Sequence, residues 1–178
     1  MDYFEVIETR RSIRKYEQRP IAEEIIQKLA ASVLRAPSSR GRRPWEFVIV
    51  TDRKMLGKLA VARSTEPSFV MGAPLAVVVG ADERACDVWI EDASIACTYI
   101  LLSAQALGLG GCWVQIRERK HPDGRWAEAY VRELLDLPSH LRVQAIIALG
   151  YPAEAKEPYN AEELPVGKIH REKYTCGE

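Results

Sequence analysis

The chain has 178 residues, of which 47% are apolar and 28% are charged, and it contains 11 glycines and 10 prolines. These proportions are typical of an ordinary globular protein, and they exclude collagen-like, disulfide-dense and intrinsically disordered chains. A chain of this length can bury roughly 70% of its unfolded surface without disulfides or metals to hold it. We therefore expect one domain that spans residues 1–178.

The charge of the chain is balanced overall but unevenly distributed. Twenty-five Lys and Arg offset 25 Asp and Glu, and a net charge of zero argues against a dedicated nucleic-acid-binding protein. Residues 1–63 carry 14 basic against 8 acidic residues, a net charge of +6, so the remaining residues carry −6. The basic first third indicates a local anion site rather than a general polyanion-binding surface.

The four cysteines form no CxxC pair and have no histidine nearby at zinc-finger spacing. We therefore expect no metal site, and reduced, buried thiols in a cytoplasmic protein. The cysteines are Cys86, Cys97, Cys112 and Cys176.

Neither the start of the chain nor its longest uncharged stretch indicates a membrane protein. The first residues are acidic and lack the apolar core of a signal peptide. Residues 95–116 carry no charge, but they include polar side chains and are interrupted by Gly108, Gly110 and Gly111. A spanning helix requires about 20 predominantly apolar residues without such a break. The stretch is better interpreted as a buried helix followed by a buried strand.

Hydrophobic periodicity predicts helices and strands that alternate irregularly along the chain. No linker or repeat divides the sequence, so we expect the α+β class. The helix over 87–107 is apolar on more than one face, which favours burial partly by a second subunit. Beyond residue 150 the chain becomes polar, and 151–178 is expected to be an extended tail. Helices are predicted over 3–9, 22–35, 52–62, 87–107 and 125–135, and strands over 45–50, 75–80, 112–116 and 143–149.

Residues 10–14, with the sequence Arg-Arg-Ser-Ile-Arg, follow the first predicted helix. Three guanidinium groups and a hydroxyl within five residues can bind a phosphate, a carboxylate or the pyrimidine edge of a flavin, because arginine offers fixed pairs of donors. A solvated basic turn would have the same composition.

Two further segments are suggestive but ambiguous by themselves. Residues 36–39, Ala-Pro-Ser-Ser, add hydroxyl groups beside three nearby arginines, although an ordinary loop would look the same. Residues 108–111, Gly-Leu-Gly-Gly, lie between a predicted helix and a predicted strand. Glycines there let backbone amides approach a ligand, but a helix C-cap would also explain them. The pattern is not GxGxxG and follows a helix, so Rossmann-type binding of NAD is disfavoured.

Four segments in this order resemble the FMN-dependent nitroreductase family, and the resemblance covers nearly the whole chain. They are residues 10–14, residues 36–48 (APSS and RPWEFV), residues 91–113 (EDASIA and LGLGGCW) and residues 149–152 (LGYP). The resemblance implies a central mixed, mainly antiparallel sheet flanked by helices, in a homodimer with a long interface helix. It also implies that the tail, residues 151–178, packs on the partner subunit.

The resemblance further implies an NAD(P)H-dependent oxidoreductase with FMN as its cofactor. Hydride would pass from NADH or NADPH to flavin N5, and then to nitroaromatics, quinones or related small molecules by ping-pong turnover. Arg10, Arg11, Ser12 and Arg14 would hold the phosphate, the ribityl chain and the N1/O2 edge. A cation at N1/O2 stabilises the negative charge of reduced flavin, and Arg14 is the candidate for that role.

The remaining implied contacts come from other segments, one of them in the partner subunit. Pro37, Ser38 and Ser39 would reach the same FMN from the other chain, and Gln115 would lie near flavin N5. The other implied cofactor residues are Gly110, Gly111, Arg43 and Lys168.

The sequence departs from the family pattern at several positions. Gly41 and Arg43 stand where members often have Asn and Gln, and residues 159–163 are acidic where many members carry a phosphate-binding Lys/Arg pair. Either Lys156, Lys168 or Arg171 replaces that pair, or Arg10 and Arg11 suffice for the phosphate. The acceptor is left open: an enal or a halogenated phenol is an alternative to a nitroaromatic, and a redox-sensing FMN module with little turnover is an alternative to an enzyme.

Overall fold

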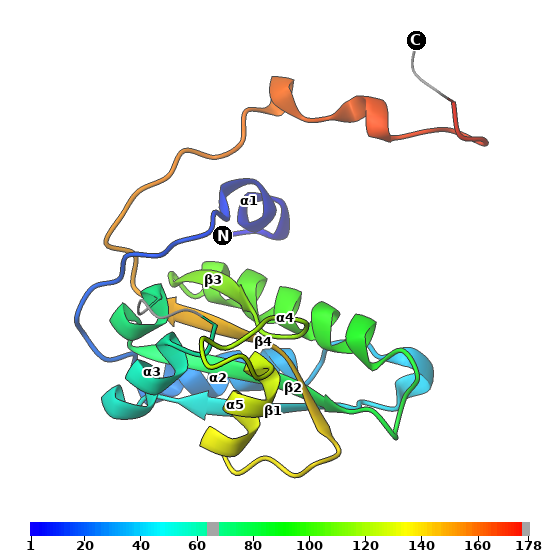
Figure 1. Ribbon diagram of the computed structural model, residues 1–178. Helices are drawn as coiled ribbons and strands as arrows, with labels where there is room; N and C mark the ends of the chain where they lie inside the picture. Colours follow the sequence, from blue (N-terminus) through cyan, green and yellow to red (C-terminus); the bar gives the residue numbers. More distant parts are fainter. Residues whose placement is uncertain (64–67, 176–178) are drawn as a thin grey trace.

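The structure is a computed structural model that describes residues 1–63 and 68–175 (Figure 1). Four strands form one sheet in the order β1-β2-β4-β3, and every neighbouring pair in it is antiparallel. The continuous apolar run that predicts a strand at 75–80 is the centre of this sheet. The strands are β1 (Trp45–Val50), β2 (Leu75–Asp82), β3 (Gly110–Gln115) and β4 (Leu141–Gly150).

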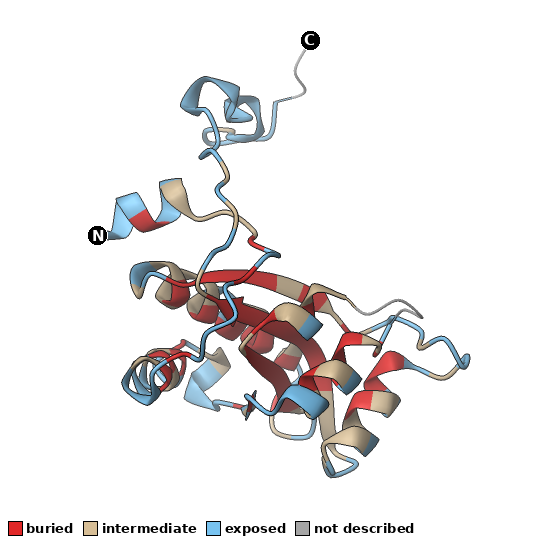
Figure 2. Ribbon diagram, turned by 90° about the vertical axis from the view of Figure 1, so that its left-hand side faces the viewer, coloured by how far each residue is buried: buried red, intermediate tan, exposed pale blue. Residues whose placement is uncertain are grey.

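Helices cover both faces of the sheet. Helices α2 (Glu23–Val33) and α4 (Trp89–Ala106) pack on one face, against residues such as Val77 of β2. On the other face, Val78 of β2 contributes to the cluster that includes the apolar residues of α3 and α5. Because both faces are covered, β2 is buried from its first residue to its seventh (Figure 2). Helix α3 is Arg53–Ala60 and α5 is Ala127–Leu134.

The predicted α+β class and helix-flanked, mainly antiparallel sheet are confirmed, and all nine predicted elements are present. The helix over 3–9 and the strand over 45–50 have the predicted bounds, and the other elements have ends shifted by one or two residues. Strand β3 begins at Gly110 rather than at residue 112. Gly110 and Gly111 pair with the last residues of β4 and belong to the strand. The turn before it is therefore short and centres on Gly108, whose φ of +75° suits glycine.

Helix α1 (Tyr3–Thr9) and the tail lie outside the three packed layers (Figure 1). Only Val6 of α1 is buried, and the helix is tied to the end of α4 by a hydrogen bond from Gln105 Nε2 to Thr9 Oγ1 at 3.0 Å. Residues 151–153 run beside residues 15–17, and the tail then leaves the body of the protein (Figures 1 and 2).

No helix in residues 1–63 and 68–175 is long and apolar enough to cross a membrane. Cys86, Cys97 and Cys112 are buried free thiols, as predicted, whereas Cys176 lies outside the described residues. Burial raises the pKa of both Cys97 and Cys112, so these thiols are protonated at neutral pH.

An ion pair whose carboxylate is buried joins α5 to the beginning of β4. Arg142 Nε lies 2.6 Å from Glu128 Oε1, and Arg142 Nη2 lies 2.9 Å from Glu128 Oε2. Glu128 Oε1 also accepts the backbone N–H of Val143 at 3.1 Å. A second carboxylate, on the more exposed Glu83, accepts from Arg142 Nη1 at 2.8 Å. The carboxylate of Glu128 therefore accepts hydrogen bonds both from the guanidinium of Arg142 and from the backbone N–H of Val143 in β4.

Replacing Glu128 by alanine should lower the free energy of unfolding by about 2–4 kcal/mol, because two N–H donors of Arg142 and the backbone N–H of Val143 lose their acceptor. Urea denaturation followed by circular dichroism measures this change. Glu83→Ala is the matched control and should cost about 1 kcal/mol or less, since its ion pair is solvent-exposed. An equal decrease in the free energy of unfolding of the two variants would show that the burial of Glu128 does not add to the stability of the protein.

Candidate functional site

Residues 10–14, here called the arginine segment, lie along the beginning of β3. The backbone N–H of Ile13 donates to Gly111 O at 3.1 Å, and Ser12 forms a parallel bridge with Gly111. This isolated bridge is parallel, whereas the paired strands of the sheet are all antiparallel. A Cβ at Gly110 would lie 2.7 Å from the Cβ of Ile13, so the close approach of the segment requires glycine at that position.

The first residues of the tail hold the arginine segment from its other side. Glu154 Oε1 accepts the backbone N–H groups of Arg14 at 2.5 Å and of Lys15 at 3.2 Å. These hydrogen bonds hold the pKa of the Glu154 carboxyl below its usual range. Lys156 Nζ donates to Ser12 O at 2.6 Å. The backbone of the segment is therefore fixed between β3 and the tail.

The three guanidinium groups of the segment differ in their contacts. Arg11 Nη1 donates to the backbone oxygen of Glu157, and its guanidinium carbon lies 4.3 Å from the centre of the Tyr159 ring. Arg14 lies 5.6 Å from the ring of Phe69. Toward the described residues, the side chains of Arg10 and Arg14 form no hydrogen bond or ion pair. Their donors are thus available for an anion at a rigidly held segment.

The loop of residues 37–43, here called loop 37–43, lies at the first turn of α4. Its Ser39 N–H donates to Asp92 Oδ1 at 2.8 Å, and Ser38 Oγ accepts the N–H of Arg43 at 2.8 Å. Pro37 and the Arg43 side chain are exposed, whereas Ser38 and Ser39 are partly buried. The predicted hydroxyl-bearing residues are therefore presented at the surface by a structured loop.

The structure does not bring loop 37–43 and the arginine segment together within one chain. Loop 37–43 contacts the first turn of α4, whereas α1, which leads into the arginine segment, is bonded to Gln105 in the last turn. Helix α4 has 18 residues and is about 27 Å long at 1.5 Å per residue. The two parts therefore lie at opposite ends of α4, which agrees with their assignment to different subunits.

In the described residues, Gln115 and Lys168 form no hydrogen bond or ion pair with either of these clusters. Gln115 ends β3, about 17 Å along the strand from Gly110 at 3.3 Å per residue. Its amide is fixed on both sides, because Oε1 accepts from Trp113 Nε1 at 2.9 Å and Nε2 donates to Arg117 O at 3.1 Å. Lys168 is exposed in the tail, beyond the residues that contact the arginine segment.

Two residues that support these clusters are missed by reasoning from the sequence. Glu154 binds backbone groups 140 residues earlier in the chain, and no local pattern signals such a contact. Asp92 lies within the segment that carries the family resemblance, but its sequence position at the start of a helix indicates only a favourable interaction with the helix dipole. Its contact with Ser39 becomes visible only once the loop is placed against α4.

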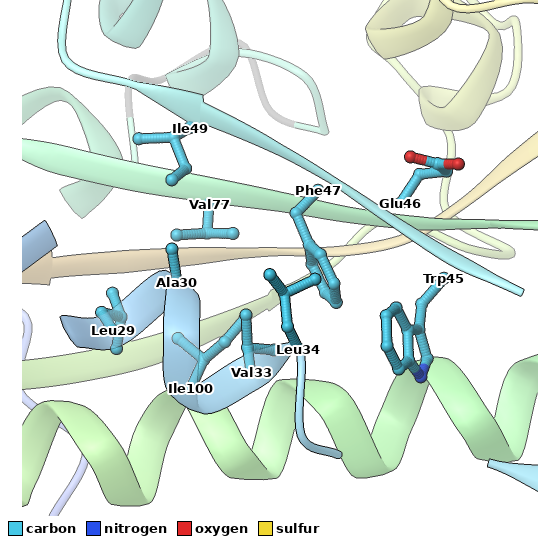
Figure 3. A pocket seen from close by; sticks show the side chains of 10 residues that line it. All are labelled: Leu29, Ala30, Val33, Leu34, Trp45, Glu46, Phe47, Ile49, Val77 and Ile100. Carbon is cyan, nitrogen blue, oxygen red and sulfur yellow. The ribbon is translucent and has the colours of Figure 1, made fainter. Parts of the chain in front are cut away.

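An apolar pocket of about 270 Å³ lies between α2, β1 and α4 (Figure 3). Its one charged lining residue is Glu46, an anion, so the pocket offers no cation to a phosphate. None of the predicted cofactor residues lines it. The other lining residues are Leu29, Ala30, Val33, Leu34, Trp45, Phe47, Ile49, Val77 and Ile100.

The described residues contain no group of three or more His, Cys, Asp or Glu side chains placed to hold a metal ion. The candidate site thus consists of two polar clusters, one at each end of α4, and of Gln115 at the end of β3. In chemical terms it offers guanidinium and hydroxyl donors to an anionic ligand.

Comparison with known proteins identifies the family. A solved structure described as an FMN-dependent nitroreductase from Clostridium difficile R20291 superposes with a TM-score of 0.93 at 44% sequence identity, covering 96% of this chain and 99% of that one. A putative NADH dehydrogenase/NAD(P)H nitroreductase from Methanothermobacter thermautotrophicus is 38% identical over 98% of this chain and 88% of its own length. A protein with the same description from Archaeoglobus fulgidus is 37% identical over 95% of this chain and 97% of its own length.

The model of the nitroreductase family matches residues 7–69 and 57–151. These ranges include the arginine segment, loop 37–43, α4 and the whole sheet. The chain belongs to the nitroreductase family, and the resemblance read from its sequence is confirmed.

Proposed function

We propose that the protein is an FMN-dependent oxidoreductase that takes hydride from NADH or NADPH and passes it to a small-molecule acceptor of the nitroaromatic or quinone type. The observation that carries this proposal is the arginine segment, where Arg10 and Arg14 offer donors from a backbone held on two sides. The relatives described as NAD(P)H nitroreductases and as an FMN-dependent nitroreductase support it.

The donors of the arginine segment fit the chemistry of FMN. Arg10 and Ser12 would bind the phosphate, and Arg11 would contribute the donors that Glu157 leaves unused. Arg14 would face the N1/O2 edge, where a fixed cation stabilises developing negative charge. Bound FMN would supply N5 as the atom that accepts and donates hydride, and Gln115, fixed by hydrogen bonds at both ends of its amide, would lie near that atom.

We infer that the site is completed by a second subunit, with Pro37, Ser38 and Ser39 reaching the same FMN. Apolar side chains on the outer faces of α1 and α4 support a homodimer: Phe4 is 72% exposed and Ile95 is 38% exposed. A groove of about 350 Å³ lies between these helices. Exposed apolar side chains beside such a groove are expected where another chain packs.

The tail is inferred to pack on the partner subunit of that homodimer. Its apolar residues are uncovered within one chain: Val166 is 70% exposed and Ile169 is 77% exposed. Packing on a second chain would bury these two side chains. It would also bring Lys168 close to the FMN bound by the partner subunit. The free buried thiols are those of a protein from a reducing compartment, and we infer a cytoplasmic location.

FMN rather than FAD should co-purify with the protein, at one molecule per chain. The arginine segment is a single cluster of anion donors, and the sequence contains no GxGxxG motif of the Rossmann type that would bind a pyrophosphate. Chromatography of the flavin released by denaturation measures this, and mainly FAD would contradict the cofactor assignment.

Turnover of NADH or NADPH distinguishes an enzyme from a redox-sensing FMN module. We expect acceptor-dependent oxidation of NAD(P)H with parallel double-reciprocal plots, the pattern of ping-pong turnover. A quinone, a nitroaromatic, an enal and a halogenated phenol should be compared as acceptors. Bound FMN that turns over with none of them would favour the redox-sensing alternative.

A further inference from the structure

Asp92 is a buried carboxylate to which the proposed function assigns no role. It lies in the first turn of α4 and is 2% exposed. Glu128, also buried, is paired with Arg142, whereas Asp92 forms no ion pair with the described residues. A buried carboxylate is unfavourable unless hydrogen bonds or a dipole stabilise its charge. The hydrogen bonds that Asp92 accepts therefore indicate which part of the protein its carboxylate positions.

The contact that Asp92 makes outside its own helix is with loop 37–43. Its Oδ1 accepts the backbone N–H of Ser39 at 2.8 Å, and the helix dipole of α4 favours an anion in the first turn. Its Oδ2 is buried without a partner in the described residues, and so is Trp45 Nε1, which lies on the side of its ring that faces α4 (Figure 3). An acceptor on α4 and a donor on β1 thus remain without a partner among the described residues.

Loop 37–43 has a backbone conformation that requires support. Arg40 and Arg43 have φ values of 52° and 48°, in the left-handed region that non-glycine residues rarely adopt. Such conformations persist where surrounding contacts fix them. One contact from the loop to the body of the protein comes from the long side chain of Arg42. The bond from Ser39 to Asp92, in contrast, fixes the loop through its backbone.

We propose that Asp92 is a positioning residue that fixes loop 37–43 for contact with the FMN held by the partner subunit. The inference rests on the proposed function. Asp92 does not touch the cofactor: it holds the Ser39 N–H, so that Pro37 and the two serines are presented in one conformation. A loop ordered before binding loses less conformational entropy when the ligand arrives. Loss of the anchor should therefore weaken FMN binding and leave the chemistry of bound FMN unchanged.

The first test removes the acceptor. Asp92→Ala should raise the Kd for FMN about tenfold to a hundredfold, the effect of losing a charge-assisted hydrogen bond, with kcat at saturating FMN unchanged. Asp92→Asn keeps a carbonyl acceptor for the Ser39 N–H and should stay within about threefold of the wild type. Ser94→Ala is the matched control, because Ser94 is on the same helix and bonds to Ile90 and Gln144 but not to the loop.

The second test removes the donor from an accessible loop, where misfolding is not expected. Ser39→Pro deletes the N–H, and Ser39→Ala deletes only the hydroxyl. Ser38 is extended, with φ −143° and ψ 156°, which suits a residue before proline, and proline is well accepted at the first position of a helical turn. Ser39→Pro should therefore bind FMN at least about tenfold more weakly than Ser39→Ala.

A third measurement does not depend on flavin. In the flavin-free protein, trypsin should cleave after Arg40 and Arg42 faster in Asp92→Ala and Ser39→Pro than in the wild type, Ser94→Ala and Ser39→Ala, because the loop is loosened. Equal cleavage and equal Kd values across all variants would overturn the inference. A wild-type protein that binds no FMN would overturn the proposed function and the role of loop 37–43 in flavin binding. The trypsin cleavage rates would still show whether Asp92 fixes the conformation of loop 37–43.

Discussion

Replacing Arg14 by alanine should lower the reduction potential of bound FMN and slow its reduction by NAD(P)H. The guanidinium of Arg14 has no acceptor among the described residues, and its backbone is fixed by Glu154, so its charge is available at the N1/O2 edge. Loss of one well-placed donor at a developing charge lowers the rate about 10²–10³-fold. Equilibration with a reference dye measures the potential, and stopped-flow absorbance measures the rate.

Arg10→Ala is the matched control for this experiment. Arg10 is assigned to the phosphate, so its loss should weaken FMN binding and leave the potential of bound FMN nearly unchanged. Equal potentials in the wild type and Arg14→Ala, with FMN fully bound in both, would show that Arg14 is not the N1/O2 partner. The role would then pass to Arg11, through the donors that Glu157 leaves unused, or to a backbone donor.

The sheet and its helices follow from local patterns in the sequence, and this part of the fold could be predicted. Residues 75–80 form an unbroken apolar run because β2 is central and covered on both faces. Helix α4 is apolar on several sides because one side faces the sheet and Ile95 lies on another that the chain leaves exposed. The segments that resemble the nitroreductase family are recognisable by their order along the chain, and the family model matches the residues that contain them.

Contacts between distant segments could not be predicted, because they depend on how the chain folds back on itself. Gly110 and Gly111 have the composition of a turn, but pairing with β4 and packing of Ile13 place them in a strand. The hydrogen bond between Glu154 and the backbone of Arg14 joins residues that are 140 positions apart in the sequence. The hydrogen bond between Asp92 and the backbone of Ser39 joins residues that are 53 positions apart. The separation of the two clusters by the length of α4 likewise becomes apparent only in three dimensions.

That separation makes a strong prediction about mixed dimers. We expect Arg10→Ala and Ser39→Pro to bind FMN poorly as separate proteins, since each lacks one half of every site. If the two parts of a site come from different subunits, a mixed dimer contains one Arg10→Ala chain and one Ser39→Pro chain. One of its sites then combines the intact arginine segment of the Ser39→Pro chain with the intact loop 37–43 of the Arg10→Ala chain. Its second site combines both defects.

Refolding the two variants together in equal amounts should therefore restore wild-type FMN affinity to about a quarter of all sites, because about half of the dimers are mixed and each has one intact site of two. Fluorescence quenching on FMN titration and NAD(P)H oxidation both measure this fraction, and each variant refolded alone is the control. If both halves lay in the same chain, no combination of the two variants would contain an intact site. Absence of any recovery in mixed dimers isolated with two different affinity tags would thus contradict the shared site, as would a monomer by light scattering that binds FMN. Recovery of FMN affinity in the mixed dimers, in contrast, would require that loop 37–43 of one chain and the arginine segment of the other contact the same flavin. The positions of these two segments at opposite ends of α4 favour that arrangement.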